Sequence, residues 1–302
     1  MKKHLALITW SGLPQGAASE RLMLPYLAGV GVETQIIDWR MMGGRSPSYD
    51  PSQFDLLVLR SCWDYHLHHD EFTDWLRRVS SEVPVLNPIE TVLWNHNKFY
   101  LREVAAQGID IAPTLFATGA TEIGTAERSQ IKSWPKIVVK PAVSASAHKT
   151  RLMDSATFSI GSEPALRMQD QPFLVQQFIP EIQSGGEISF IYIDGLFSHA
   201  VLKRPAVGDF RVQQEHGGSA ELFHPPPALL AQADQIASTV PQVREALYCR
   251  IDAVARDGKL VLMELELIEP ELFLALAEGA AERLAKAIVR RMRLRLFDQT
   301  RS

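Results

Sequence analysis

The sequence has few cysteines, no long apolar run and little net charge. Of its 302 residues only Cys62 and Cys249 are cysteines, which excludes a disulfide-rich scaffold and favours a reducing compartment. The early apolar run, His4–Thr9, is too short for a signal peptide, and no run approaches the length of a membrane span. The net charge of −4 gives no general reason to expect nucleic acid. We therefore expect a cytoplasmic protein with neither a membrane nor a nucleic-acid partner.

Two nucleotide-binding fingerprints are also absent. The sequence contains neither GxxxxGK[ST] nor GxGxxG, so neither motif argues for bound nucleotide. A chain of 302 residues with 46% hydrophobic residues can nevertheless bury a large core, and its length suggests two domains or more.

Residues 1–88 show the alternation of strands and helices that is typical of an α/β unit. Alternating elements of this kind favour a parallel sheet, whose ligand crevice lies at the carboxyl ends of its strands. The expected strands are 5–9, 32–38, 54–60 and 83–86, and the expected helices are about 18–28, bent at Pro25, and about 70–79.

The third of these strands runs into the polar and aromatic segment Arg60–Tyr65. A buried strand that ends in arginine needs an anionic partner for that residue, so we expect Arg60 and Asp64 to contact substrate. Cys62 and the nearby histidines could suggest zinc, but no second Cys/His group at ligand spacing supports it. His68 and His69 are better interpreted as the entry to a helix.

The stretch Asp252–Pro270 reads as a β-hairpin around the turn Arg256–Lys259. Its second arm places Glu264 and Glu266 on one face, and we expect an unbroken apolar face on the other side, formed by Val261, Met263, Leu265 and Leu267.

The turn decides where Asp252 points. A two-residue Asp-Gly loop would pair Ala253 with Leu262 and turn Asp252 toward the aliphatic face. A three-residue loop with a bulge at Gly258 would pair Asp252 with Leu262 and bring all three acids together. We predict the bulged loop, because burying a carboxylate among aliphatic side chains would cost several kcal/mol.

Three carboxylates on one patch repel one another, and a divalent cation relieves that repulsion. All-oxygen ligands suit Mg²⁺ or Mn²⁺ better than zinc. The alternative is a surface hairpin whose acidic face is only solvated. The hairpin by itself leaves both interpretations open.

Further candidate residues follow in order along the chain. Lys98 lies in a connector (89–120), and Lys140 ends an apolar strand in a smaller unit (121–184). The residues after Lys140 are small and hydroxylated, which suggests a mobile loop. A mostly antiparallel unit (185–302) contains the acidic hairpin. It ends in a helix expected over 272–297, with Leu284, Ile288 and Met292 on one stripe and arginines near its end, which we interpret as complementing the helix dipole.

This order of parts resembles the ATP-grasp superfamily, and within it glutathione synthetase and the cyclo-ligase that forms D-cycloserine. The resemblance spans most of the chain, and its most specific stretches are RSCWDYH, NKFYLRE, VVKPAVSA, KRPAVGDFRVQQEHGG and LMELELIEPELFL. It implies a mixed α/β (α+β) protein, an ATP-grasp fold with an N-terminal Rossmann-like pre-ATP-grasp domain.

The resemblance also implies roles for individual residues. Lys98 and Lys140 match the lysines that hold ATP phosphates, and Glu187 matches the acid on the ribose hydroxyls, a position for which Glu181 is a weaker candidate. Arg211 matches the arginine that stabilises the transferring phosphoryl group. The remaining implied positions are Gln176, Gln177, Phe178 and Ile179 for adenine, Ser144 and Ser146 in a lid loop (Val143–Thr150), Arg60, Asp64, Tyr65, Gly217 and Gly218 for substrate, and Asp252, Glu264 and Glu266 for metal.

Two positions depart from the common pattern. The third metal ligand is often asparagine in the superfamily and is Glu266 here, which adds a negative charge. The loop after Lys140 has fewer glycines than is common, which restricts how closely its backbone can approach the γ-phosphate.

Together these features predict an ATP-dependent carboxylate–amine ligase that works through an acyl phosphate. We expect ATP as co-substrate, two Mg²⁺ ions or Mn²⁺ in their place, and small-molecule carboxylate and amine substrates that can belong to one molecule. The sequence is compatible with a homodimer and does not fix the oligomeric state. The alternatives are an ATP-binding regulatory protein, which would not need the acid trio or Arg211, and a carboxylate kinase.

Overall fold

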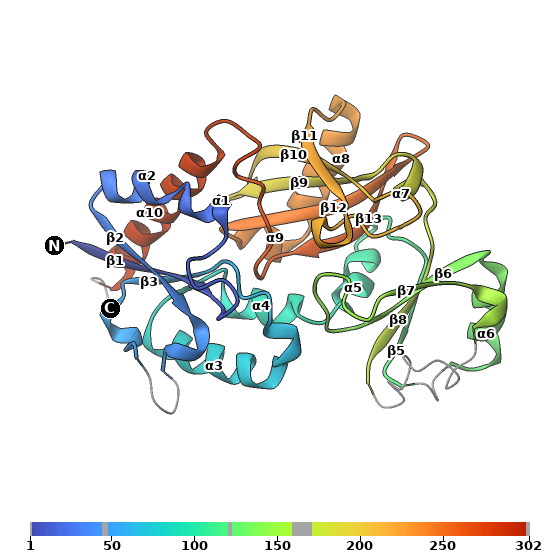
Figure 1. The fold of residues 1–302 in the computed structure, drawn as a ribbon, viewed down its shortest axis with the longest axis horizontal. Coiled ribbons are helices and arrows are strands. Elements are labelled where there is room, and N and C mark those ends of the chain that lie inside the picture. Colours follow the sequence, from blue (N-terminus) through green and yellow to red (C-terminus); the bar gives the residue numbers. More distant parts are fainter. Residues whose placement is uncertain (1, 44–47, 120–122, 159–170, 300–302) are drawn as a thin grey trace.

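The computed structural model describes residues 2–43, 48–119, 123–158 and 171–299 of the chain. Within these ranges the strands form three sheets. The N-terminal sheet and the small sheet lie toward opposite ends of the molecule, and the large sheet lies between them (Figure 1).

The N-terminal sheet is parallel, as the alternating pattern predicted, with the order β2-β1-β3-β4. Leu5 and Leu7 of β1 pack on one side with helices α2 and α10, whereas Ala6 and Ile8 pack on the other side with α3. Its elements are β1 (Lys3–Thr9), α1 (Ala18–Arg21), α2 (Leu24–Gly29), β2 (Val32–Asp38), β3 (Leu56–Leu59), α3 (His69–Glu82), β4 (Val85–Leu86) and α4 (Ile89–Asn95), with short 3-10 turns at Trp39–Met41, Pro51–Gln53 and Tyr65–Leu67.

Two predicted helices differ from the observed ones. The helix expected over 18–28 is divided, because Pro25 lies in the first turn of α2 and cannot continue α1. The last helix, α10 (Ala280–Gln299), begins eight residues later than the predicted start at Leu272. Its stripe of Leu284, Ile288 and Met292 is buried as predicted, and it packs beside α2 on the N-terminal sheet (Figure 1).

The small sheet is antiparallel with the order β5-β8-β6-β7. Helix α6 covers it through Ile131, which is buried with Ile137 and Val139 of β6. Its elements are β5 (Thr114–Ala117), α6 (Thr125–Ser133), β6 (Lys136–Pro141), β7 (Arg151–Asp154) and β8 (Phe173–Gln177), and α5 (Tyr100–Ala106) precedes them.

The large sheet is antiparallel with the order β11-β10-β9-β12-β13. One of its faces packs on α8 and α5 in the largest apolar cluster. Its elements are α7 (Glu181–Ser184), β9 (Glu187–Ile193), β10 (Leu196–Arg204), β11 (Ser219–Phe223), α8 (Pro227–Thr239), α9 (Pro241–Glu245), β12 (Tyr248–Arg256) and β13 (Lys259–Glu266), with a 3-10 turn at Gln214–His216.

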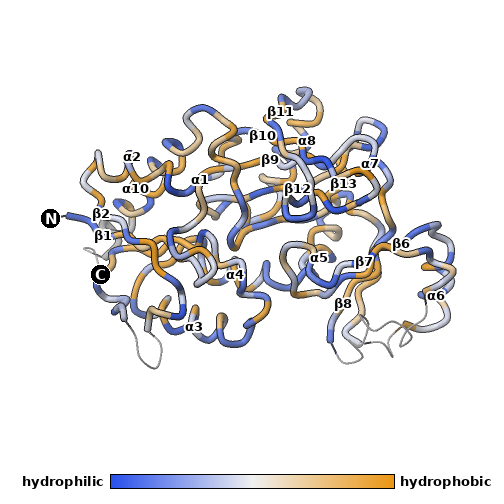
Figure 2. Tube along the Cα trace, viewed as in Figure 1, coloured by the Kyte–Doolittle hydropathy of each residue, from blue (hydrophilic) through white to orange (hydrophobic). Residues whose placement is uncertain are grey.

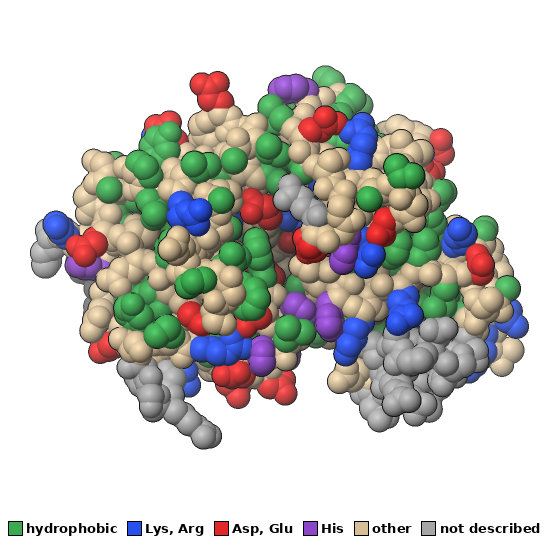
Figure 3. All heavy atoms as spheres, in the orientation of Figure 1, with side chains coloured by type: hydrophobic (Ala, Val, Ile, Leu, Met, Phe, Trp, Pro, Cys, Tyr) green, Lys and Arg blue, Asp and Glu red, His purple; other side chains and the backbone are tan. Residues whose placement is uncertain are grey.

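The distribution of polarity agrees with this architecture. The central strands are mostly hydrophobic, and polar segments lie toward the outside (Figure 2). On the face that Figure 3 shows, acidic and basic side chains are interspersed. No helix within the described ranges combines the length and the apolar character that crossing a membrane requires.

Candidate active site

A pocket of about 370 Å³ is lined by residues of the small sheet, the large sheet and the segment that follows β3. We call the part lined by Val138, Lys140 and the end of β8 the small-sheet end, and the part lined by Trp63, Tyr65 and Phe273 the aromatic end. Every residue predicted to bind ATP lines this pocket, namely Lys98, Lys140, Ser144, Ser146, Gln176, Gln177, Phe178, Ile179 and Glu187.

The acidic hairpin supplies the floor between these two ends, but its turn is not the predicted one. Arg256 pairs with Lys259, so the loop has two residues. Its residues Asp257 and Gly258 have φ of 51° and 77°, as a type I′ turn requires. Ala253 therefore pairs with Leu262, which is the register that would turn Asp252 toward the aliphatic side.

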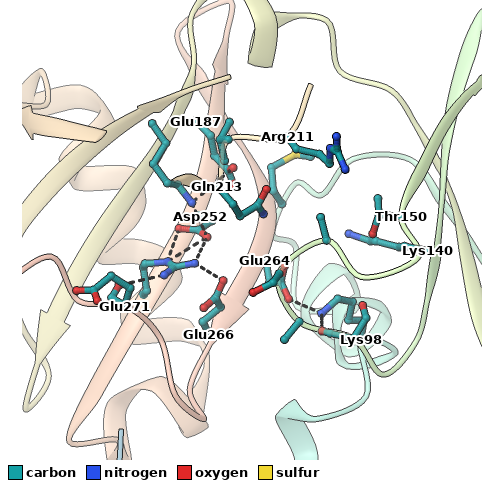
Figure 4. A pocket seen from close by; sticks show the side chains of 18 of the residues that line it. Lys98, Lys140, Thr150, Glu187, Arg211, Gln213, Asp252, Glu264, Glu266 and Glu271 are labelled. Carbon is teal, nitrogen blue, oxygen red and sulfur yellow. Dashed lines mark hydrogen bonds and ion pairs between the residues drawn. The ribbon is translucent and has the colours of Figure 1, made fainter. Parts of the chain in front are cut away.

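A bulge in β13 reverses that outcome. The register shifts between Asp252 and Ala253, so that Asp252 pairs with Glu264 and Met263 is the extra residue. The three acids consequently share a face, as predicted, although for a different reason (Figure 4). The same bulge divides the predicted apolar face: Leu265 and Leu267 pack in one cluster, and Val261 packs in another, with Met263 against it.

Asp252 is held by two cations. Its carboxylate accepts hydrogen bonds from Lys203 Nζ at 3.0 Å, from Arg250 Nη2 at 2.9 Å and from Ser189 Oγ at 2.5 Å. Burial by itself would raise the pKa of Asp252, but Arg250 and Lys203 lower it below its ordinary value. Asp252 is therefore ionised in this environment.

The two glutamates of β13 also have cationic partners. Lys98 Nζ donates to Glu264 at 2.5 Å, and the Glu266 carboxylate contacts the guanidinium of Arg250. Burial would raise the pKa of Glu264, but Lys98 and Lys140 lower it. For Glu266 burial prevails and raises the pKa to about 8. The pKa of Glu264 is thus lowered and that of Glu266 is raised, although both carboxylates lie in the same pocket.

The cationic partners of the three acids determine whether their carboxylates can converge on one metal ion. Three hard oxygen donors on one face fit Mg²⁺ in chemistry. However, within the part of the chain that the structure describes, no three acidic, histidine or cysteine side chains converge closely enough to hold an ion. The predicted three-carboxylate cluster is therefore not formed, because each acid is drawn to a neighbouring lysine or arginine.

The small-sheet end carries the two predicted lysines. Lys98 Nζ donates to the carbonyl of Ser144 at 2.8 Å, which ties it to the loop after β6. Burial lowers the pKa of Lys140, and Glu264 partly offsets this effect. In Figure 4, Lys98, Lys140 and Thr150 all lie on the same side of Glu264. A polyanion at this end would meet two adjacent positive charges.

Glu187 begins β9 and lies 3.6 Å from Lys203 Nζ. Its burial raises the pKa to about 7, against the opposite influence of Lys203. A buried carboxylate at this edge of the small-sheet end can accept hydrogen bonds from a hydroxylated ligand.

Arg211 lies in the loop between β10 and β11, where Asp209 holds its guanidinium. The Nη2 of Arg211 donates to Asp209 at 2.8 Å, and Arg211 keeps a side-chain exposure of 34%. The predicted Gly217 and Gly218 do not line the pocket. They shape this loop instead, since a Cβ at Gly218 would lie 2.2 Å from the carbonyl oxygen of Val212.

Arg60 and Asp64, which we expected to contact substrate, lie outside the pocket lining, whereas Tyr65 lines it. Arg60 is 1% exposed and finds its anionic partner in Glu20, at 3.5 Å. Asp64 accepts from Trp39 Nε1 at 3.0 Å and pairs with Arg40. The structure therefore places both charges in the packing of the N-terminal sheet.

Arg60 also donates a hydrogen bond to the segment after β13, Leu267–Leu272. This segment has no helix or strand, yet each of its six backbone carbonyls accepts a hydrogen bond from a different buried or partly buried side chain, at 2.6–3.0 Å. The donors, in order along the segment, are Asn87, Tyr248, Trp63, Arg60, Arg250 and His199. We call Leu267–Leu272 the anchored segment, and it forms one wall of the aromatic end.

The sequence analysis missed three residues that this geometry brings to the pocket: Lys203, Arg250 and Glu269. Arg250 precedes Asp252 by two positions on β12, so the alternation of a strand could have placed both on one face. Lys203 is opposite Glu187 on the neighbouring strand, a pairing that only the sheet order reveals.

Comparisons with known proteins give one family match in the N-terminal part of the chain and a second one in the remainder. Residues 5–87 match a family model described as the N-terminal domain of D-cycloserine synthetase DcsG, and residues 105–256 match one described as the ATP-grasp domain of prokaryotic glutathione synthetase. The chain is 26% identical over 281 residues to the cycloserine biosynthesis protein DcsG of Streptomyces lavendulae, covering 87% of this chain and 90% of that protein.

Solved structures show the same fold. The crystal structure of D-cycloserine synthetase DcsG matches with a TM-score of 0.79 and 24% identity, covering 96% of this chain and 99% of that one. The D-alanine–D-alanine ligase of Bacillus anthracis complexed with ATP matches with a TM-score of 0.70 and 15% identity, covering 99% of each. Since the match to the glutathione synthetase model spans half of the sequence, the chain belongs to the prokaryotic glutathione synthetase ATP-grasp family and is an ATP-dependent carboxylate–amine ligase.

Proposed function

We propose that this ligase activates the carboxylate of a small, amino-acid-like substrate as an acyl phosphate and joins it to an amine. The observation that carries the proposal is the arrangement of the pocket. Lys98, Lys140 and the end of β8 lie at the small-sheet end, the acidic hairpin forms the middle, and the same pocket continues to the aromatic end. In Figure 4, Lys140 and Glu271 lie on opposite sides of Asp252 and Glu264. ATP and substrate can thus meet over the acidic hairpin.

The small-sheet end supplies the nucleotide contacts. Lys98 and Lys140 bind the phosphates as point charges, and the segment Gln176–Ile179 binds adenine through its backbone. Glu187 accepts from the ribose hydroxyls. When phosphate is bound, Lys98 can exchange Glu264 for a phosphate oxygen, which frees that carboxylate.

Asp252, Glu264 and Glu266 are the residues that would hold Mg²⁺, once their carboxylates turn from the lysine and arginine partners toward the ion. The bound ion, or a pair of ions, supplies positive charge that offsets the charge of the phosphates, and Mn²⁺ can replace it. Arg250 positions Asp252 and Glu266, Lys203 positions Asp252, and Lys98 positions Glu264.

Arg211 and the lid loop (Val143–Thr150) complete the site. The substrate carboxylate attacks the γ-phosphorus, ADP leaves, and the amine then displaces phosphate from the acyl phosphate as it loses its proton. Arg211 stabilises the negative charge on the transferring group. The lid loop lies against the pocket through Ser144–Ala147 and Thr150, where it excludes water from the acyl phosphate.

The similarity to DcsG along most of both chains favours a reaction in which amine and carboxylate belong to one molecule, giving a small cyclic amide. A ligase that joins two molecules is the second candidate, supported by the match to the glutathione synthetase model.

An ADP-release screen with Mg²⁺ tests the proposal, with amino-acid pairs and with ureido and aminooxy amino acids as substrates. We expect at least one compound to give equal amounts of ADP, phosphate and amide. ADP formed together with a stable phosphorylated carboxylate would instead indicate a kinase. Binding of ATP without turnover of any compound would indicate a regulatory protein.

A further inference from the structure

Glu269 differs from every other buried carboxylate of the pocket in the described part of the chain, because no other residue donates a hydrogen bond to it or pairs with it. Asp252 and Glu187 have Lys203 and other partners, whereas Glu269 is 8% exposed, lines the pocket and has no such contact with its carboxylate. An unpaired buried carboxylate is unfavourable unless a ligand supplies its partner.

The backbone of Glu269 is fixed, whereas its carboxylate accepts a hydrogen bond only from its own backbone N–H. It lies in the anchored segment, where Trp63 Nε1 donates to its carbonyl at 3.0 Å. The carbonyls on either side accept from Tyr248 and Arg60 at 2.9 and 3.0 Å. The backbone that carries the carboxylate is thus fixed at the aromatic end, which favours a recognition role for Glu269.

Its surroundings favour a cationic ligand group. Trp63 and Tyr65 line the same end of the pocket, and aromatic faces attract ammonium groups. Lys98 and Arg250 are close enough to act on Glu269 electrostatically, but they are bonded to Glu264 and Asp252. Burial raises the pKa of Glu269 to about 7, which agrees with a carboxyl group that lacks a positive partner.

We propose that Glu269 binds an ammonium group of the substrate and thereby makes the enzyme specific for substrates that carry a free amine beside the carboxylate to be activated. This inference rests on the proposed function, since it assigns the substrate of that reaction to the aromatic end. It deepens that function by naming the group on the substrate that the protein recognises.

The test compares matched substrates in matched variants. Each compound that turns over in the ADP-release screen is assayed beside its desamino analogue, with the wild type, Glu269→Gln, Glu269→Asp and the control Glu278→Gln, which changes an exposed carboxylate. The wild type and the control should prefer the amine by tenfold or more in kcat/KM. Glu269→Gln should reduce this preference to less than about threefold, Glu269→Asp should retain part of it, and the KM for ATP should change by less than about twofold.

A preference that survives in Glu269→Gln overturns the inference, and so does a wild type without preference, which decides the question even if the variants do not fold. If the wild type turns over no compound, the proposed function fails separately. Calorimetric titration with D- and L-alanine, serine and glutamate and their desamino analogues, in the presence of ADP and Mg²⁺, then tests Glu269 alone. Equal binding of the amines by wild type and Glu269→Gln, or no binding by either, contradicts it.

Discussion

The two ends of the pocket are built in different ways. At the small-sheet end the lining residues come from strands or directly follow them, as with Lys140 on β6 and Gln177 on β8. At the aromatic end the wall is the anchored segment, which has no regular structure and is fixed by side chains from four separate regions of the chain. A local pattern can predict the first kind of wall, whereas the second exists only after distant parts of the chain have met.

This comparison predicts that variants of the middle and small-sheet end change chemistry, while variants around the anchored segment change stability and substrate binding. The largest effect is expected for Glu264→Gln. Loss of one carboxylate that would hold the metal should reduce turnover by about a hundredfold to a thousandfold, with little change in fold, since glutamine can still accept from Lys98. ADP release and circular dichroism measure the two properties. Turnover within threefold of wild type would remove Glu264 from the metal site.

The next effect concerns Arg60, whose charge sequence analysis assigned to substrate. Arg60→Met leaves Glu20 buried without its cation and Pro270 without its donor, so unfolding in urea should show a loss of about 3 kcal/mol. Adding Glu20→Gln should restore part of that loss, because it removes the uncompensated charge. A single variant as stable as wild type would contradict this structural role.

Acid should destabilise the fold through His199, which contacts the far end of the anchored segment. His199 donates from Nε2 to the carbonyl of Leu272, and burial lowers its pKa to about 4 from the ordinary 6.5. The unfolded chain therefore binds more protons below pH 6.5, so this contribution to stability is complete above that pH and is lost as the pH falls toward 4. At pH 5 the loss is at most about 2 kcal/mol. Urea unfolding of wild type and His199→Gln from pH 7 to 4.5 should show a smaller pH dependence in the variant, and parallel curves would exclude His199 as its source.

The smallest effect is expected in the lid loop, the counterpart of the anchored segment at the small-sheet end. Ala147 has φ of 53°, and Ser146 and Lys149 are also left-handed. Ala147→Gly relieves about 1 kcal/mol of backbone strain, but the greater freedom of glycine in the unfolded chain costs nearly as much. The free energy of unfolding should change by less than about 0.5 kcal/mol. A loss above 1 kcal/mol would show that the methyl group of Ala147 makes contacts that stabilise the fold.

The acidic hairpin shows how far the sequence could be interpreted. The strands, the turn position and the shared face of Glu264 and Glu266 follow from alternation alone. The choice of loop was wrong, because the alternation does not reveal the extra residue Met263 that moves Asp252 back to the acids. The burial cost that motivated the choice was sound, but a bulge inside the strand meets the same requirement as a bulge in the turn.

The sequence by itself determined the parallel N-terminal sheet, the hairpin strands, the order of the candidate groups along the chain and the ATP-grasp resemblance, because strand periodicity and motif spacing are local properties. Only the tertiary structure decided which charges reach the pocket. Arg60 and Glu269 are both flanked by apolar and polar residues that give no hint of their environment. One is neutralised by Glu20 and the other left without a partner because of where distant segments pack, and the energy of a buried charge depends on those neighbours rather than on its position in the chain.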